Sequence, residues 1–437
     1  MQRSLAFFTA LKPTIDRFLS SNIMRLGLSI IGGLAMLPLF VNAQAVQAKE
    51  TLNLSQAISF ALSEHPEMSV FGHQRKSLDA RIKQAGVLPR PTIGFTIEDA
   101  MGTGTHSNFG AAQSTLSIAW VLEQSAIEKR VDAATNAATQ VDFDIEIKAL
   151  DISAYTAKLF IESLILEQRL QLAELAEKQA DSALSAITRR VEAGKSLSIE
   201  QLQSKAELVR RSLEVEDLDH ELKASRYQLV AQWGGEVSDY VLQGELLNVP
   251  AIKDLSSQLA KLQAHPALLA FANKQRIAQS QIELARIEAR PKWQVSAGIK
   301  RYESTDDYGI VAGISIPFGK DSRSLGEVRV IQAQQAEYQS QSDVFTRKLS
   351  TQLFVLLQNM EHSKHVIDAL TEQVIPLLEK ASEEASKAYD IGRLGYLEWT
   401  SIRQELLSTQ AQLLDAYQAI HLQYIEIQRL TGASLSN

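Results

Sequence analysis

Two histidines next to a glutamate are the strongest candidates in this chain for metal binding or catalysis. His362 and His365 stand three residues apart within a predicted helix, next to Glu361, so both imidazoles would project from one helix face. Such a pair could supply two ligands of a zinc site, but zinc requires a third protein ligand, and the sequence offers no clear one. A solvated helix face is the favoured interpretation, and we predict no bound metal.

No other set of residues forms an enzyme motif. The chain has no cysteine, which excludes disulfides, thiol catalysis, cysteine-ligated zinc and a lipid-carrying cysteine. His65 and His265 each precede a proline, which suits the start of a helix rather than catalysis. The sequence has no phosphate-binding glycine loop, no Walker signature and no Ser-His-Asp order in motif context. We therefore expect a protein that is not an enzyme and needs no cofactor.

Net charge and the N-terminal segment bear on where the protein acts. The formal net charge of −7 gives no electrostatic support for a nucleic-acid partner. Residues 26–41 are apolar, follow Arg17 and Arg25, and are too few to span a bilayer, which predicts a signal peptide over residues 1–48 rather than an anchor helix. Small residues allow cleavage after Ala43, Ala45 or Ala48. We hypothesise that Met24 is the initiator and expect the mature protein to be exported.

The chain is organised around a helical run over residues 124–194. This run has no proline, and no glycine before Gly194, so as one helix it would extend roughly 100 Å. Its apolar residues recur at alternating spacings of four and three, a heptad seam formed by Ile127, Val131, Ala134, Ala138, Val141 and Ile145. After Gly194, the seam continues at Ile199, Leu202, Ala206, Val209 and Leu213. Residues 124–233 are therefore predicted to form an antiparallel helical hairpin.

Two alternating segments precede this hairpin. Residues 92–99 and 114–122 alternate apolar and small polar side chains, the pattern of β-strands. Their length of about nine residues suits a transmembrane barrel strand, although four such strands could also form a small soluble sheet. Helical segments over residues 51–86 lead into the first strand.

The same order of elements occurs twice. His65-Pro66 recurs 200 residues later as His265-Pro266, and the turn glycines Gly194 and Gly392 lie 198 residues apart, which indicates an internal duplication. The predicted second strands and second hairpin cover residues 292–301, 308–317 and 324–432, with a mild break at Pro376. The predicted divisions are a first repeat, a linker and a second repeat, at residues 49–235, 236–253 and 254–433. The linker includes a short strand at residues 240–242.

Four strands in one chain cannot close a membrane barrel. Bacterial outer-membrane barrels have even strand numbers from about eight upward, and side chains fill a barrel of eight. Two copies would therefore make a plugged barrel, whereas three copies would supply twelve strands and an open lumen. The narrow seams of the hairpins also need neighbours, so the accompanying helices could form a hollow tube. We expect a homotrimer in contact with outer-membrane lipid.

This duplicated plan resembles the TolC family of trimeric outer-membrane efflux factors over residues 51–433. The turn at residues 389–392 (Tyr-Asp-Ile-Gly), followed by Glu398, is similar to the family's periplasmic tip, and Arg-Leu-Thr-Gly at residues 429–432 is similar to its C-terminal signature. Two paired segments look like its helix-to-barrel crossings, residues 85–91 and 285–291. The resemblance implies a mainly α-helical protein with a membrane β-barrel, in which a trimeric twelve-stranded barrel continues into an α-helical barrel across the periplasm.

The resemblance also implies a passive exit duct of a tripartite efflux or secretion system. Small molecules or metal cations would pass from an inner-membrane pump, of the resistance-nodulation-division type, through a periplasmic adaptor and this channel to the exterior. The implied adaptor contacts are the two turns, at Gly194, Lys195, Gly392 and Arg393. The implied gate residues are Tyr389, Glu398, Ser401 and Glu200.

An acidic ring narrows the tunnel near the tip in this family. Glu398 holds the first acidic position of that ring, but Ser401 replaces the second, which weakens the ring and puts a cation gate of the familiar kind in doubt. Glu200 holds the equivalent place in the first repeat, where an exposed carboxylate in the first turn of a helix is the favoured interpretation.

Residues 123–130 (Glu-Gln-Ser-Ala-Ile-Glu-Lys-Arg) are similar to a stretch of the cobalt–zinc–cadmium efflux branch of the family. They keep its acid and its basic pair but lack its two glycines.

Two other classes of protein remain as alternatives. A periplasmic coiled-coil adaptor would carry one hairpin flanked by β domains, and a structural coiled-coil protein would not need two pairs of amphipathic strands. The transported substrate stays open.

Overall fold

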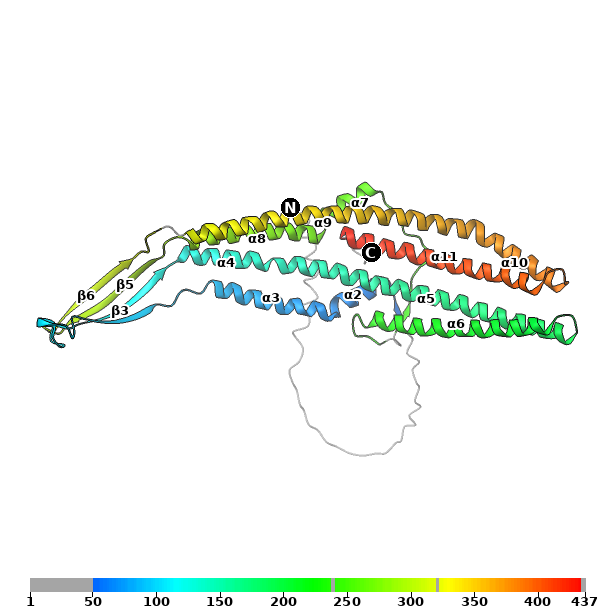
Figure 1. Ribbon diagram of the computed structural model, residues 1–437, viewed down its shortest axis with the longest axis horizontal. Coiled ribbons are helices and arrows are strands. Elements are labelled where there is room, and N and C mark those ends of the chain that lie inside the picture. Colours follow the sequence, from blue (N-terminus) through cyan, green and yellow to red (C-terminus); the bar gives the residue numbers. More distant parts are fainter. Residues whose placement is uncertain (1–49, 237–239, 320–321, 434–437) are drawn as a thin grey trace, which may run out of the picture. The chain divides into compact units, whose positions relative to one another are not determined.

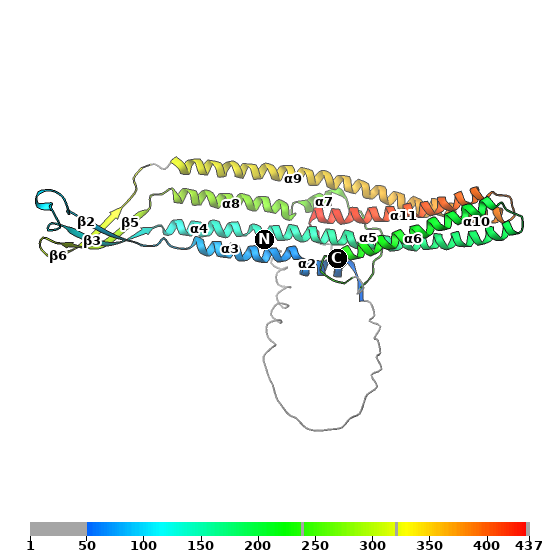
Figure 2. The same cartoon turned by 60° about the horizontal axis from the view of Figure 1, so that its bottom comes forward.

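The computed structural model describes residues 50–236, 240–319 and 322–433 (Figures 1 and 2). The predicted signal peptide, its cleavage sites and the predicted initiator Met24 lie outside the described residues. The described chain belongs to one unit. Within it, the long strands lie at one end of the helices and the two hairpin turns lie at the other end (Figure 1).

The first copy of the plan ends with a long helical hairpin. Its elements in chain order are β1 (Glu50–Leu52), α2 (Leu54–Glu64), α3 (Pro66–Ala85), β2 (Thr92–Glu98), the 3-10 turn η1 (Gly104–His106), β3 (Gln113–Leu122), α4 (Gln124–Ala138), α5 (Gln140–Glu192) and α6 (Ser198–Val230). The break between α4 and α5 is the single residue Thr139, so the predicted long helical run continues in direction from residue 124 to residue 192.

The second copy repeats this order with one irregular helix. Its elements are β4 (Tyr240–Leu242), α7 (Leu255–Leu262), α8 (Pro266–Glu288), β5 (Trp293–Tyr302), β6 (Asp307–Ser315), α9 (Ser322–Ala369), the π-helical turn η3 (Leu370–Val374), α10 (Ile375–Asp390) and α11 (Tyr396–Thr431). The π-helical turn ends two residues before Pro376, which has no N–H for the regular helical ladder and whose ring crowds the preceding turn. The predicted break at this proline is confirmed.

The two histidine–proline pairs start helices, as the sequence predicts. The Nδ1 atom of His65 accepts a hydrogen bond from the Glu67 amide at 3.2 Å, and Nδ1 of His265 accepts one from the Ala267 amide at 3.1 Å. Each following proline occupies the first helical position, where a missing N–H costs nothing. The repeated histidines therefore have a capping role.

One expectation about local structure is wrong. Residues 51 and 52 are predicted to begin a helix, but they belong to β1, which pairs in parallel with β4 nearly 200 residues later. A distant partner decides this outcome, and local periodicity does not report that partner.

The seams of the hairpins are predicted to need neighbours. In α6, four apolar side chains of the seam are more than half exposed within the single chain: Ile199, Leu202, Val209 and Leu213.

The long strands form one antiparallel sheet in the order β2-β3-β5-β6. Strands of both copies thus adjoin, because β3 pairs with β5 over the full length of both strands, from Gln113 opposite Tyr302 to Leu122 opposite Trp293. Within the described residues, β2 and β6 each have one unpaired edge. The sheet of a single chain therefore does not close into a barrel.

The main hydrophobic core lies along the middle of the helices. Phe160 from α5, Leu353 from α9 and Ile420 from α11 are at most 1% exposed. Next to this core, Nε2 of His421 lies 2.8 Å from the carbonyl oxygen of Leu246, which ties the segment between the two copies to α11. Among the helices that the structure describes, none combines the length and the apolar character that a membrane crossing requires.

Candidate functional site

The two hairpin turns have the same backbone geometry. Gly194 and Gly392 adopt φ angles of +67° and +74°, and the next amides, of Lys195 and Arg393, donate to the carbonyls of Arg190 and Ala388 at 2.7 and 2.8 Å. This pattern is a Schellman ending, which requires a left-handed residue that glycine adopts without strain. The predicted adaptor-contact residues therefore lie together at the exposed end of the two hairpins, with Lys195 and Arg393 exposed.

The turn geometry predicts the effect of a methyl group there. A Cβ atom at Gly392 would meet nothing within 4 Å, so Gly392→Ala introduces only backbone strain, about 1–2 kcal/mol for a left-handed alanine. We expect a lower midpoint of thermal unfolding, measured by circular dichroism. The matched control is Gly326→Ala in α9, where the space is equally open and the backbone is helical. That change is expected to raise the midpoint, because alanine favours helix over glycine.

Behind the turns, aromatic rings from the second hairpin stack on one another. The Tyr389 ring lies parallel to the Trp399 ring, with 4.6 Å between centroids and 4° between planes. Tyr396 completes the cluster at 6.2 to 6.4 Å from both rings. All three side chains are at most 7% exposed, and they pack on Ile187 of α5. The cluster thus joins the second hairpin to the first.

Two arginines enclose this stack. The guanidinium carbon of Arg190, from α5, lies 4.8 Å from the Tyr389 ring centroid, and that of Arg403, from α11, lies 5.0 Å from the Trp399 ring centroid. Arg190 Nη1 also donates to the carbonyls of Tyr389 and Asp390 at 3.3 and 3.1 Å. Those carbonyls end α10, where a positive charge is favourable. Arg190 therefore clamps the first hairpin to the turn of the second.

The structure brings only some of the predicted gate residues into this cluster. Tyr389 is buried, and burial raises the pKa of its hydroxyl, with the Glu200 carboxylate acting in the same direction. Glu398 is exposed and accepts a hydrogen bond from the Gly395 amide at 3.3 Å, which caps α11. Ser401 is exposed. Glu200 begins α6 and is half-buried, so the expectation of an exposed carboxylate there is wrong.

The sequence analysis did not identify four residues of the cluster: Tyr396, Trp399, Arg403 and Arg190. Tyr396 and Trp399 are three residues apart and Arg403 follows four residues later, a spacing that places them along one face of α11. This aromatic and basic pattern was available in the sequence. The contact of Arg190 with Tyr389 could not be predicted from the sequence, because the ring that Arg190 covers belongs to a helix almost 200 residues away.

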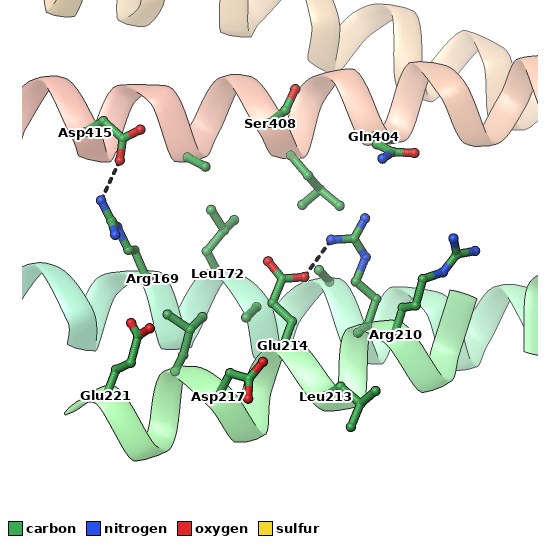
Figure 3. A pocket seen from close by; sticks show the side chains of 16 residues that line it. Arg169, Leu172, Arg210, Leu213, Glu214, Asp217, Glu221, Gln404, Ser408 and Asp415 are labelled. Atoms are coloured by element: carbon green, nitrogen blue, oxygen red, sulfur yellow. Dashed lines mark hydrogen bonds and ion pairs between the residues drawn. The ribbon is translucent and has the colours of Figure 1, made fainter. Parts of the chain in front are cut away.

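A charged groove lies between α5, α6 and α11, on the core side of the hairpin tips (Figure 3). It has a volume of about 720 Å³, and its lining includes Ala173 and Ala176 of α5. Arg169 pairs with Asp415 across it at 2.5 Å, and Arg211 pairs with Glu214 along α6 at 2.8 Å. The small side chains of the two alanines, between charged residues, leave room for another elongated element.

The open sheet has two chemically different faces. One face is apolar and well exposed, as Ile93 at 77% and Ile310 at 89% show. The register places these side chains on that face: Ile93, Phe95, Ile97, Leu116, Ile118, Trp120, Val295, Ala297, Ile299, Ile310, Ala312 and Ile314. The opposite face carries mainly small and polar residues: Thr92, Gly94, Thr96, Thr115, Ser117, Ala119, Ser296, Gly298, Gly309 and Gly313. This division matches strands with lipid on one side and water on the other.

A network of ion pairs joins the sheet to the helices. The Glu123 carboxylate, only 6% exposed, accepts from Arg130 at 3.0 Å and from Lys292 at 2.6 Å. Arg130 also pairs with Glu288 of α8 at 2.8 Å. Burial opposes ionisation of Glu123, but the hydrogen bonds from Lys292 and Arg130 outweigh it and lower its pKa. Glu123 and Arg130, from the stretch 123–130, therefore connect the end of β3 to the helices α4 and α8.

His362 and His365 lie exposed on α9, next to the exposed Glu361. Across residues 50–236, 240–319 and 322–433, no three His, Asp or Glu side chains are grouped to hold a metal ion.

Comparisons with known proteins agree with this architecture. The family described as outer membrane efflux protein matches residues 57–235. The cobalt-zinc-cadmium resistance protein CzcC of Cupriavidus metallidurans is 25% identical over 408 residues, covering 92% of this chain and 94% of that protein. The outer membrane protein VceC of Vibrio cholerae has a TM-score of 0.67 at 16% identity, covering 87% of this chain and 96% of that one.

The open-state MtrE outer membrane channel of Neisseria gonorrhoeae has a TM-score of 0.68 at 14% identity, covering 87% of this chain and 89% of that one. These two structures share the fold. The family match and the long alignment with CzcC disfavour the adaptor and structural alternatives, as does the presence of two hairpins. The family match over the first repeat and the nearly full-length relative therefore identify the chain as an outer-membrane efflux protein, an exit channel of tripartite efflux systems that lies in the outer membrane and extends into the periplasm.

Proposed function

We propose that three copies of this chain close one twelve-stranded barrel and one helical tunnel, which together passively conduct cargo out of the cell. The observation that carries the proposal is the four-stranded sheet with an exposed apolar face and two unpaired edges. Unpaired strand edges cannot remain in lipid, because each free backbone group costs several kcal/mol there. Pairing β6 of one copy with β2 of the next satisfies both edges.

The exposed seam of α6 supports the same assembly. Leu202 and Leu213 are 67% and 54% exposed, and with Ile199 and Val209 they form one apolar stripe. A stripe of this kind on a long helix needs a partner helix, and within the chain α6 packs against α5 with its other face. A neighbouring copy would cover it.

The molar mass of the detergent-solubilised protein, measured by light scattering, tests this assembly. Three chains per particle are expected. A particle of one chain, extracted without detergent, would rule out the shared barrel.

The membrane-facing side of the sheet gives a second prediction. Ile118→Arg puts a charge in the middle of the apolar face of β3, which costs about 2–4 kcal/mol near the midplane of a bilayer. We expect much less folded trimer in outer-membrane fractions. The matched control is Ser117→Arg, which faces the other side between Gly94 and Gly298. Equal loss in both variants would contradict the assignment of the faces.

We further propose that a periplasmic adaptor binds at the two hairpin tips and that an inner-membrane pump of the resistance-nodulation-division type supplies the energy. The exposed turns with Lys195 and Arg393 support this contact. Crosslinking from a photoreactive residue at position 195 should capture an adaptor in cells. The same residue at position 227, which is exposed on α6 toward the core, serves as the control.

The cargo we propose is a divalent transition-metal cation. The support is the alignment with CzcC, whose name specifies cobalt, zinc and cadmium, over nearly the full length of both chains. Deleting the gene should lower the concentrations of these ions that arrest growth, while tolerance of lipophilic drugs stays unchanged. Loss of drug tolerance alone would assign the channel to other small molecules.

A further inference from the structure

The water-facing side of the sheet carries its charges in one place. Along the four long strands, this face is formed by small or uncharged side chains from the helical end up to the row of Gly94, Ser117 and Gly298. Its charged residues are Glu98, Lys300 and Asp307, all in the two rows farthest from the helices. In a closed barrel these rows form the outer mouth.

Lys300 is held in a defined position there. Its ammonium lies 2.7 Å from a Glu98 carboxylate oxygen and 2.9 Å from the Gln113 side-chain oxygen. Gln113 in turn donates to Asp99 at 2.8 Å. The Lys300 side chain is 17% exposed, which is low for a lysine on an open sheet, whereas Glu98 is 52% exposed. Lys300 therefore spans neighbouring strands and neutralises the carboxylate beside it.

We propose that Lys300 sets the ion selectivity of the exit mouth by keeping Glu98 from holding departing cations. This inference rests on the proposed three-copy barrel. Conduction requires that an ion bind weakly enough to leave each site. Three unpaired Glu98 carboxylates around one mouth would attract divalent cations, and three Lys300 ammonium groups remove that attraction. A cation carried through the tunnel then meets no ring of unpaired Glu98 carboxylates at the point of release.

The test is single-channel recording of the purified trimer in planar bilayers at 0.1 M KCl, where the screening length is about 10 Å. Lys300→Gln should raise the ratio of potassium to chloride permeability about twofold or more, and the shift should shrink at 1 M salt. Micromolar ZnCl₂ added on the outer side should then reduce the current of this variant more than that of the unchanged protein.

Arg301→Gln is the matched control. Arg301 is the next residue of β5 and carries the same charge, but it lies on the opposite face and pairs with Glu303 and Asp306 of the following turn. It should leave permeability ratios and zinc sensitivity unchanged. Glu98→Gln should shift selectivity the other way, toward chloride, and this second variant tests the role of the pair even where Lys300→Gln does not assemble.

The outcomes separate the two proposals. If the unchanged protein forms no channel, the three-copy barrel fails. If it conducts, but Lys300→Gln behaves like Arg301→Gln, or Glu98→Gln shows no shift toward chloride, the role of Lys300 is overturned and the barrel stands.

Discussion

Replacing Tyr389 by alanine is expected to raise the conductance of the channel in planar bilayers and to lengthen its open events. The Tyr389 ring is 4% exposed and stacks on Trp399 from one side while Arg190 covers the other. Truncating a buried aromatic side chain costs about 3–5 kcal/mol, and a stacked pair adds about 0.5–1.5 kcal/mol beyond its burial. This loss falls on the contact between the two hairpin tips, so they should separate more readily.

Two further variants identify which part of the contact matters. Tyr389→Phe keeps the ring and its stack, and it should conduct like the unchanged protein. Arg190→Lys keeps the charge but loses the planar group that covers the ring and reaches two carbonyls, so an increase in conductance is expected, smaller than that of Tyr389→Ala. Unchanged conductance in both Tyr389→Ala and Arg190→Lys would show that this cluster does not hold the tips together.

Replacing Glu123 by glutamine is expected to lower the thermal stability of the trimer at neutral pH. The carboxylate holds Arg130 and Lys292 together at the point where the sheet meets the helices. Hydrogen bonds to charged groups contribute about 1.5–3 kcal/mol each, although the partial exposure of both bases lets water replace part of this. The midpoint of unfolding in detergent, followed by circular dichroism, should fall by several degrees.

The difference in unfolding midpoint between the unchanged protein and Glu123→Gln should decrease as the pH falls. Because the folded state lowers the pKa of Glu123, its ionisation stabilises the folded protein fully above the ordinary pKa, about 4.3. The stabilisation is lost as the pH falls through the lower folded pKa. The unfolding midpoints of the unchanged protein and Glu123→Gln should therefore differ at pH 7 and converge in strong acid.

Glu283→Gln is the control for this variant. Glu283 pairs with Lys129 in the same region at 3.1 Å, but its side chain is 45% exposed and water screens the pair, so this change should lower the midpoint of unfolding less than Glu123→Gln does. A shift as large as that of Glu123→Gln would mean that general surface charge, rather than the buried carboxylate, stabilises the junction.

Local patterns in the amino-acid sequence predict the order of the elements and their duplication. Heptad spacing without proline, strict alternation in the strands and left-handed glycines at the turns are local signals, and each reports the conformation of its own segment. The turns at Gly194 and Gly392 and the capping histidines His65 and His265 follow from such signals, and the structure has them as expected. The unpaired strands and narrow seams also indicated that one chain is incomplete.

The contacts between residues far apart in the chain are visible only in the folded protein. The clamp of Arg190 on Tyr389, the pairing of β1 with β4 and the bridge from Glu123 to Lys292 each join residues about 170 to 200 positions apart. Periodicity contains no information about such contacts, because it records which face of an element is apolar and not what covers that face. The exposed seam of α6 is the clearest case, since the same spacing suits a partner within the chain or a neighbouring copy.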